Sequence, residues 1–179
     1  MKLEEKTLDS RLAFQGKILY ATQDEVSLPD GTKSLRDVIH HSGGVGILPL
    51  TEEGDIYMVR QYRYPHHTVT LEIPAGKREE GEEPLDCGIR ELREETGCVS
   101  GKITDLGELL PTPAYDTEVI HMYLAEDIKR VGDQSLDSDE FINLEKVPLK
   151  KAVAMVMRGE IRDAKTVAAV LKTWYIKQG

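Results

Sequence analysis

Three glutamates, Glu91, Glu94 and Glu95, lie within one short stretch of this 179-residue sequence. In a helix, Glu91 and Glu95 are one turn apart on the same face, and Glu94 lies beside them. Carboxylates crowded in this way repel each other, and a hard divalent cation with oxygen ligands relieves that repulsion. The spacing therefore predicts a metal site, with Mg²⁺ as the natural ion and Mn²⁺ as its alternative. A solvated, charged helix face is the competing interpretation of such a run taken alone.

The residues around the glutamates predict the helix that positions them. Pro84 suits a first helical position, because its missing N–H would have no partner there. Gly97 suits the left-handed residue that ends a helix. Between them an apolar stripe repeats at helical spacing: Leu85, Ile89, Leu92 and Thr96. We therefore expect a helix over residues 84–96.

The wider stretch, residues 76–98, reads GKREEGEEPLDCGIRELREETGC. Gly76, Glu82, Arg90 and Gly97 stand at fixed distances from the three glutamates, and at every fixed position the stretch resembles the signature of the Nudix hydrolases. A chance match must place all four of these residues as well as the glutamates, which disfavours the solvated-face interpretation.

The resemblance implies roles for the residues of the motif. Glu91 and Glu95, with Glu94 close behind, match the metal ligands of the family, and the backbone carbonyl of Ala75 matches a further ligand. Glu82 either binds metal or holds the loop. Arg90 is expected to orient the motif carboxylates, a role compatible with a simple ion pair to Glu94. Glu72 is either another member of the cluster or an outward-facing strand residue.

Three flanking segments narrow the resemblance to the ADP-ribose pyrophosphatase branch: VRQYRYP (residues 59–65), LEIPAGK (71–77) and PTPAYDTE (111–118). Pro113 lies sixteen residues beyond Gly97, as in that branch, and GEIRDAKTVAAVL (159–171) is also similar to it. The branch implies Mg²⁺-dependent hydrolysis of ADP-ribose to AMP and ribose 5-phosphate.

Five residues outside the motif are candidates for binding the substrate: Phe14, Arg36, Arg63, Pro113 and Glu118. Arg36 and Arg63 offer paired donors to phosphate oxygens, although a surface ion pair is the alternative for each. The resemblance places Glu118 against the distal ribose. For Phe14 we favour a core position, with stacking against the adenine as the alternative.

The loop before the last predicted strand departs from the family pattern. Relatives often carry a catalytic glutamate there, and Ser138 stands in its place. A serine is a poor base at neutral pH. We expect Glu140 to take that role, with Asp137 and Asp139 as alternatives and a solvated acidic loop as the competing interpretation.

Strand and helix patterns mix without regular alternation, which favours a mixed sheet between helices. Strands are expected at residues 17–20, 25–28, 34–40, 45–50, 56–63, 68–73, 103–110, 119–125 and 141–146, and two helices at 148–158 and from Asp163 towards Lys177. The resemblance implies the same α/β/α sandwich, an α/β (α+β) fold, over residues 44–179, preceded by an antiparallel β extension over residues 1–43. In relatives that extension joins two subunits, so a homodimer is expected.

Composition limits the partners. The net charge of −9 argues against a general nucleic-acid or anionic-membrane surface, and the longest apolar run, residues 45–50, is too short to span a bilayer. Residues 1–8 lack the apolar core of a signal peptide. Cys87 and Cys98 have no metal-like spacing and suit a reducing cytoplasm.

Apart from ADP-ribose hydrolysis, the open alternatives are hydrolysis of a nucleotide sugar or dinucleoside polyphosphate and binding of ADP-ribose without cleavage.

Overall fold

A computed structural model describes residues 2–138 and 140–178. The chain forms two compact units. The first consists of the chain up to Gly43 together with Leu110–Val119, and the second consists of Gly44–Leu109 and the chain from Ile120 onwards. The motif lies wholly within the second unit.

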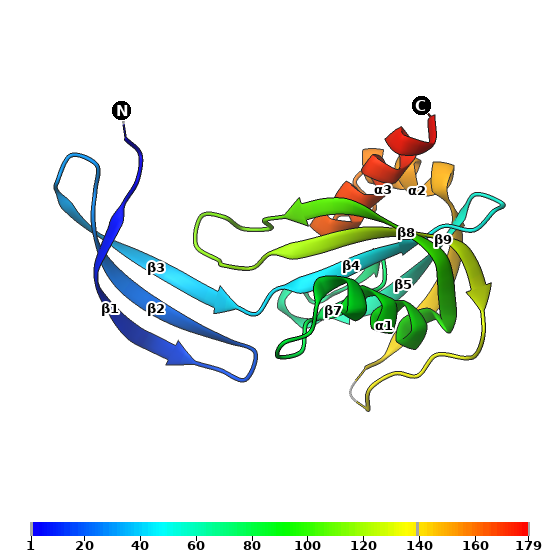
Figure 1. Cartoon of the computed structure of the whole chain (residues 1–179), viewed down its shortest axis with the longest axis horizontal. Helices are drawn as coiled ribbons and strands as arrows, with labels where there is room; N and C mark the ends of the chain where they lie inside the picture. The colour runs from blue at the N-terminus through cyan, green and yellow to red at the C-terminus, as the bar shows by residue number, and fades with distance from the viewer. Residues whose placement is uncertain (1, 139, 179) are drawn as a thin grey trace. The chain divides into compact units, whose positions relative to one another are not determined.

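The first unit is an antiparallel sheet of β1 (Lys6–Gln15), β2 (Leu19–Ser27) and β3 (Lys33–His41), in that order (Figure 1). Asp30 shapes the turn between β2 and β3, because its carboxylate accepts hydrogen bonds from the Thr32 amide at 2.9 Å and the Thr32 hydroxyl at 2.7 Å. Two short strands were expected where β2 runs unbroken, and β1 was not predicted. β2 pairs with β3 without a break, and β1 pairs with β2 across two register shifts, so backbone pairing rather than an apolar pattern holds the polar residues of this sheet.

Residues 110–119 belong to this unit although they connect two strands of the other. The Ile39 amide donates to the Tyr115 carbonyl at 2.7 Å, and the Thr117 amide donates to the Ile39 carbonyl at 2.9 Å. The His41 amide also donates to the Thr117 hydroxyl at 3.1 Å. The segment therefore lies along β3 as a short parallel partner.

The second unit contains two sheets. One has the order β10 (Ile142–Pro148), β5 (Asp55–Arg63), β6 (Thr68–Glu72), all antiparallel, and the other has the order β7 (Ala75–Lys77), β4 (Gly44–Pro49), β9 (Ile120–Arg130), β8 (Cys98–Leu109). β4 and β9 run parallel, so this second sheet is mixed. β4 is buried along its whole length, as an apolar strand covered on both faces must be. A short 3₁₀ turn, η1 (Tyr64–His66), follows β5.

Helices cover both sides of these sheets. α1 (Pro84–Thr96) packs Leu92 against Ile47, Cys98 and Ala125, whereas α2 (Leu149–Met157) and α3 (Ala164–Gln178) cover a larger cluster that includes Leu48, Ile56, Met58 and Met122. Figure 1 shows α1 on one side of the sheets and the two C-terminal helices on the other. The predicted α/β/α sandwich with a mixed sheet is confirmed.

The strands around the motif differ from the prediction mainly at their ends. β8 begins at Cys98, five residues before the expected start, and β9 continues to Arg130. Pairing from Cys98 opposite Arg130 to Leu109 opposite Ile120 holds these polar ends in the ladder. β7 was not predicted. Among helices in the described ranges, 2–138 and 140–178, none has the length and apolar character that a bilayer crossing requires.

Candidate active site

α1 begins and ends at the predicted residues. Pro84 is its first residue, and Gly97 ends it with a left-handed backbone, φ 69°, while its amide donates to the Arg93 carbonyl. A side chain at Gly97 would place its Cβ only 2.2 Å from the Gly132 carbonyl oxygen. Glycine is therefore required here both by the backbone angle and by the close approach of residues 132–133.

Two of the three motif glutamates are buried on the side of α1 that faces the sheet. Glu91 is 7% exposed and Glu95 is 3% exposed. The Ala75 amide donates to Glu95 Oε2 at 3.1 Å. Burial, followed by the charge of Glu91, raises the pKa of Glu95 to about 8, and burial also raises the pKa of Glu91. Two carboxyl groups thus share a region from which water is largely excluded, and burial disfavours the charged form of each.

The Arg90 guanidinium forms hydrogen bonds with three carboxylates of the motif. Its Nε donates to Glu82 Oε1 at 2.9 Å, and its Nη1 donates to Glu91 Oε1 at 2.7 Å and to Glu94 Oε2 at 2.9 Å. The Arg90 guanidinium holds the pKa of Glu82 at about 2. This geometry fits the expected orienting role of Arg90, since one guanidinium fixes three carboxylates at once.

Glu82 also organises the loop before the helix. Its Oε2 accepts the Glu79 amide at 2.9 Å, and its backbone carbonyl accepts two hydrogen bonds from Arg78, at 3.0 and 2.7 Å. Of the two roles left open for Glu82, these contacts favour holding the loop.

Gly76 leaves space for the carboxylate of Glu91. A Cβ at residue 76 would lie 1.7 Å from Glu91 Oε1 and 2.1 Å from Glu91 Cδ. Gly88, by contrast, faces the core, where a Cβ would meet Val45 at 3.2 Å and Tyr123 at 3.3 Å. Gly76 thus accommodates a functional carboxylate, whereas Gly88 allows α1 to pack closely on the sheet.

The donor set fits a hard divalent cation. Within the described part of the chain, no three or more His, Cys, Asp or Glu side chains already stand at metal-binding spacing. The structure nevertheless brings Glu91 and Glu95 together beside the Ala75 backbone. Their raised pKa values show that a nearby positive charge would be favourable there. Glu94 lies at the edge of this cluster, with its side chain 39% exposed.

Glu140 lies in the loop between β9 and β10. Its carboxylate accepts the Asp137 amide at 3.3 Å, and its own amide donates to the Asp137 carbonyl at 3.0 Å. Its charge contributes to the raised pKa of both Glu91 and Glu95. Ser138 is exposed, and Asp139 lies outside the described residues.

Arg63 is held by a buried network that the sequence did not reveal. Its Nε and Nη2 donate to Glu72 at 2.8 and 2.6 Å, and Lys165 forms ion pairs with Glu72 and, at 3.0 Å, with Asp163. Burial opposes ionisation of Glu72, but these cations lower its pKa to about 2. Glu72 is therefore engaged by side chains rather than open to a metal ion. No sequence pattern links Glu72 with Lys165, which lies 93 positions later in the chain.

The other four candidates, Phe14, Arg36, Pro113 and Glu118, belong to the first unit. Phe14 is 58% exposed, which is contrary to a core position within this unit. Arg36 forms a bidentate ion pair with Glu5, at 2.9 and 2.7 Å. Glu118 lies 3.3 Å from His41 Nδ1. Pro113 is exposed in the segment beside β3.

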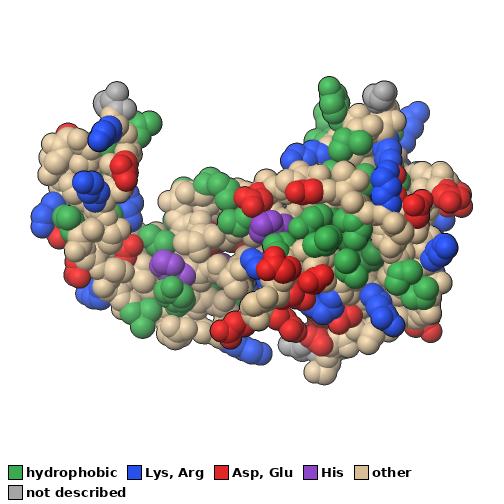
Figure 2. Space-filling model, viewed as in Figure 1, with side chains coloured by type: hydrophobic (Ala, Val, Ile, Leu, Met, Phe, Trp, Pro, Cys, Tyr) green, Lys and Arg blue, Asp and Glu red, His purple; other side chains and the backbone are tan. Residues whose placement is uncertain are grey.

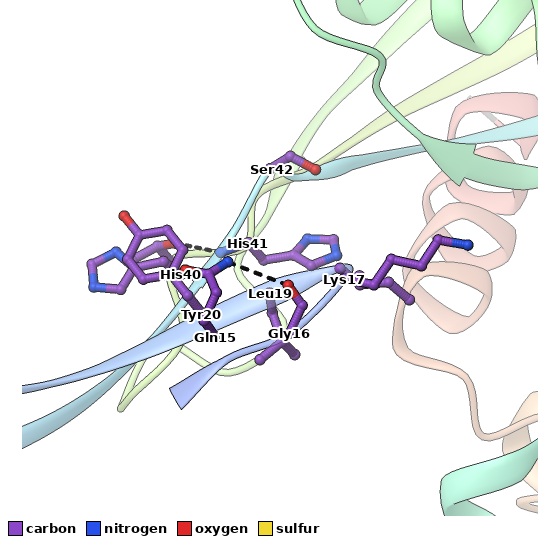
Figure 3. A pocket seen from close by; sticks show the side chains of 10 residues that line it. Gln15, Gly16, Lys17, Leu19, Tyr20, His40, His41 and Ser42 are labelled. Carbon is purple, nitrogen blue, oxygen red and sulfur yellow. Dashed lines mark hydrogen bonds between the residues drawn. The ribbon is translucent and has the colours of Figure 1, made fainter. Parts of the chain in front are cut away.

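A cavity of about 360 Å³ lies within the first unit (Figure 3). It is lined by the β1–β2 turn and by His40, His41, Ser42 and Thr117. At its edge the rings of Tyr20 and His40 stack in parallel, with centroids 4.3 Å apart. This stack could not be predicted from the sequence, because it depends on the register that places Tyr20 opposite His40.

The comparisons with known proteins agree with the motif. The family model of the NUDIX domain matches residues 40–170. The chain belongs to the Nudix family. The sequence is 40% identical over 169 residues to the ADP-ribose pyrophosphatase of Bacillus subtilis (strain 168), covering 94% of this chain and 91% of that protein. The methanol dehydrogenase activator of Bacillus methanolicus is 39% identical over 168 residues, with 93% and 91% covered.

Two further matches concern substrate range and fold. The GDP-mannose pyrophosphatase of Citrobacter koseri (strain ATCC BAA-895 / CDC 4225-83 / SGSC4696) is 34% identical over 154 residues, covering 77% of this Nudix chain and 80% of the relative. A crystal structure of an ADP compounds hydrolase superposes with a TM-score of 0.85 over 100% of this chain and 98% of the other, at 17% identity, which concerns the fold alone. Together with the motif, the family assignment makes this chain a Nudix hydrolase that uses a divalent metal ion.

Proposed function

We propose that this Nudix hydrolase cleaves the diphosphate bond of ADP-ribose, releasing AMP and ribose 5-phosphate, with Mg²⁺ as its metal ion. The observation that carries the proposal is the pair of buried carboxylates, Glu91 and Glu95, held beside the Ala75 backbone on the motif helix. The 40% identity to an ADP-ribose pyrophosphatase over most of both chains supports ADP-ribose as the substrate.

The site residues divide into those that hold the cation and those that hold the substrate. Glu91 and Glu95, with the Ala75 carbonyl and with Glu94 at the edge, would hold the metal. When bound, the cation offsets the negative charge of the diphosphate and activates water for attack. Arg90 keeps Glu91 and Glu94 in place through the hydrogen bonds at 2.7 and 2.9 Å.

Figure 2 shows acidic side chains gathered on the face of the second unit that carries α1. An acidic surface repels a diphosphate, so local cations are needed for binding. Arg63 is our proposed diphosphate contact in this unit, because Glu72 fixes its planar guanidinium through two hydrogen bonds and limits the freedom lost on binding.

Glu140 is the proposed general base. A base must lie within reach of the water that it deprotonates, and the charge of Glu140 already acts on Glu91 and Glu95. Among the described residues, its carboxylate accepts one long hydrogen bond, from the Asp137 amide at 3.3 Å, which holds it weakly and allows it to turn towards a water molecule.

We assign residues 44–179 to the hydrolase domain and propose that the extension over residues 1–43 forms a homodimer. A sheet buries an apolar face only against another element, and the first unit exposes several large apolar side chains: Leu8, Leu12, Phe14 and Leu35, each between 49% and 59% exposed. Phe14, Arg36, Pro113 and Glu118 are the proposed substrate contacts of this unit. Sedimentation that finds only monomer at micromolar concentration would contradict the dimer.

A cytoplasmic location belongs to the same proposal. Cys87 and Cys98 are both buried and unbridged, as is usual in a reducing compartment. Fractionation of cells that places the protein outside the cytoplasm would contradict it.

The deciding experiment measures AMP release from ADP-ribose with Mg²⁺, beside a metal-free control and the variant Glu95→Gln. We expect release that is lost in both controls, and parallel assays with Mn²⁺ establish the preferred ion. ADP-glucose, GDP-mannose and diadenosine polyphosphates are tested in the same way. Faster cleavage of one of these would replace ADP-ribose as substrate, and tight ADP-ribose binding without any cleavage would make the protein a sensor.

A further inference from the structure

Residues 131–135 lie against the C-terminal end of the motif helix. The Val131 amide donates to the Gly97 carbonyl at 2.8 Å, and the Ser135 amide donates to the Glu94 carbonyl at 2.8 Å. The side-chain amide of Gln134 donates to the Glu95 carbonyl at 2.7 Å. We call residues 131–135 the strap. It supplies partners for helix-end carbonyls that α1 itself leaves without a hydrogen bond.

The peptide groups that hold the strap belong to functional residues. Glu94 and Glu95 carry two of the proposed metal-binding carboxylates, and their backbone carbonyls accept the hydrogen bonds from Ser135 and Gln134. The strap therefore contacts directly the two residues whose side chains belong to the proposed metal site.

The chain continues directly from the strap to Glu140. Only residues 136–139 separate Ser135 from the proposed base, and the turn between Asp137 and Glu140 is closed by a backbone hydrogen bond of 3.0 Å. Five residues separate Gln134 from Glu140, and β10 holds the other end of the segment from Ile142 onwards, so the two ends limit where Glu140 can lie. The contact of the strap with α1 and the start of β10 at Ile142 together set how far Glu140 lies from the metal site.

We propose that Gln134 is a positioning residue for hydrolysis, whose side-chain amide anchors the strap on the Glu95 carbonyl and so places Glu140 at the metal site. The inference rests on the proposed function, because Glu140 is its base. It adds a residue outside the Nudix motif to the residues on which turnover depends.

Gln134 is the strap residue suited to this role. It is half-buried while its strap neighbours are exposed, and its contact with α1 is made by the side chain, whereas those of Val131 and Ser135 are made by the backbone. Asp133 provides a matched control, because its side chain is 99% exposed and pairs with Arg130 on the surface at 3.2 Å.

The test compares Gln134→Met with Asp133→Asn. Methionine keeps the length of the side chain and removes the donor. We expect Gln134→Met to lower kcat about fivefold to tenfold, as the loss of one well-formed hydrogen bond allows, with KM and melting temperature nearly unchanged. Asp133→Asn is expected to retain wild-type kcat.

A double-variant cycle separates positioning from a general structural effect. If Gln134 acts through Glu140, Gln134→Met lowers kcat little further in the Glu140→Gln background. A full additional fivefold to tenfold loss in that background would overturn the proposal, as would wild-type kcat in Gln134→Met alone.

Amide hydrogen exchange provides a readout that needs no substrate. Gln134→Met is expected to speed exchange at the amides of Ser135 and Glu140 by about fivefold or more, while Asp133→Asn leaves them unchanged. Unchanged exchange in Gln134→Met would refute the anchoring role even if the protein cleaved no diphosphate. Absence of hydrolysis in the wild-type protein, with faster exchange in the variant, would refute the proposed function and leave the anchor standing.

Discussion

Replacing Gly76 by alanine should separate the activity of this Nudix hydrolase from its stability. The new Cβ would lie 1.7 Å from Glu91 Oε1, and side-chain carbons essentially never approach another heavy atom within 3.0 Å. The Glu91 carboxylate must therefore retreat by about 1.3 Å. A misplacement of about 1 Å at a reacting centre costs on the order of 100-fold in rate, so we expect kcat for AMP release to fall by that order.

The stability of the same variant should fall by at most about 3 kcal/mol, because two effects partly offset each other. The atoms that must move are the far end of a flexible side chain, and Gly76 has no positive φ that alanine would strain. A glycine-to-alanine change at a compatible backbone position stabilises by about 0.4–1 kcal/mol through the unfolded state. This offsets part of the roughly 1.5–3 kcal/mol lost if the hydrogen bond from Arg90 to Glu91 breaks. The net change in unfolding free energy should therefore stay below about 3 kcal/mol.

The assay follows AMP release over a range of Mg²⁺ concentrations, with thermal unfolding measured on the same samples. Gly88→Ala is the matched control, because it lies in the same motif but its Cβ would press on Val45 and Tyr123 rather than on a carboxylate. We expect Gly88→Ala to change melting temperature while retaining turnover. Wild-type turnover and Mg²⁺ dependence in Gly76→Ala would show that the position of Glu91 does not limit the reaction, and the reasoning would fail.

Three further outcomes follow from the same site. Glu140→Gln should lower kcat at least tenfold without changing the melting temperature, and wild-type turnover would remove Glu140 as the base. Arg90→Met leaves three carboxylates without their shared partner, so it should destabilise the metal-free protein by roughly 2–3 kcal/mol in urea unfolding, and an unchanged midpoint would contradict this. Because the pKa of Glu95 is raised to about 8 in the folded state, its contribution to stability is fully present below its unfolded pKa of about 4.5 and is lost as pH rises towards 8. The unfolding free energy of the metal-free protein should therefore decline between pH 4.5 and 8. The variant Glu95→Gln should show a smaller decline. An equally steep decline in the variant would exclude Glu95 as its source.

The helix that carries the site was predictable because its signals are local. Pro84, Gly97 and the apolar stripe between them lie within one element, and α1 runs from Pro84 to Thr96 as expected. The sequence also predicted the start of the last helix at Asp163, whose carboxylate accepts hydrogen bonds from the Thr166 amide at 3.0 Å and the Thr166 hydroxyl at 2.6 Å. Spacing along one chain segment is sufficient in both cases.

The contacts that were not predicted depend on strand register and on loops. The ion pairs of Glu72 with Arg63 and Lys165 require β5, β6 and α3 to meet. The hydrogen bond from Gln134 to the Glu95 carbonyl requires a loop of ordinary polar composition to fold back on α1. No residue type or spacing marks such pairs in a single sequence, because they arise only once separate elements have packed.

The pairing of residues 110–119 with β3 bears on how this protein can be cut and recombined. The chain passes between the two units three times, after Gly43, after Leu109 and after Val119. A single proteolytic cut near Gly43 therefore leaves the pieces connected by non-covalent pairing at Ile39 and His41. A shortened gene that begins at Gly44 would produce a hydrolase domain whose β8–β9 connection has lost its hydrogen-bonding partner. The extension is thus interwoven with the hydrolase sequence, and a graft of it onto another Nudix domain must carry residues 110–119 along.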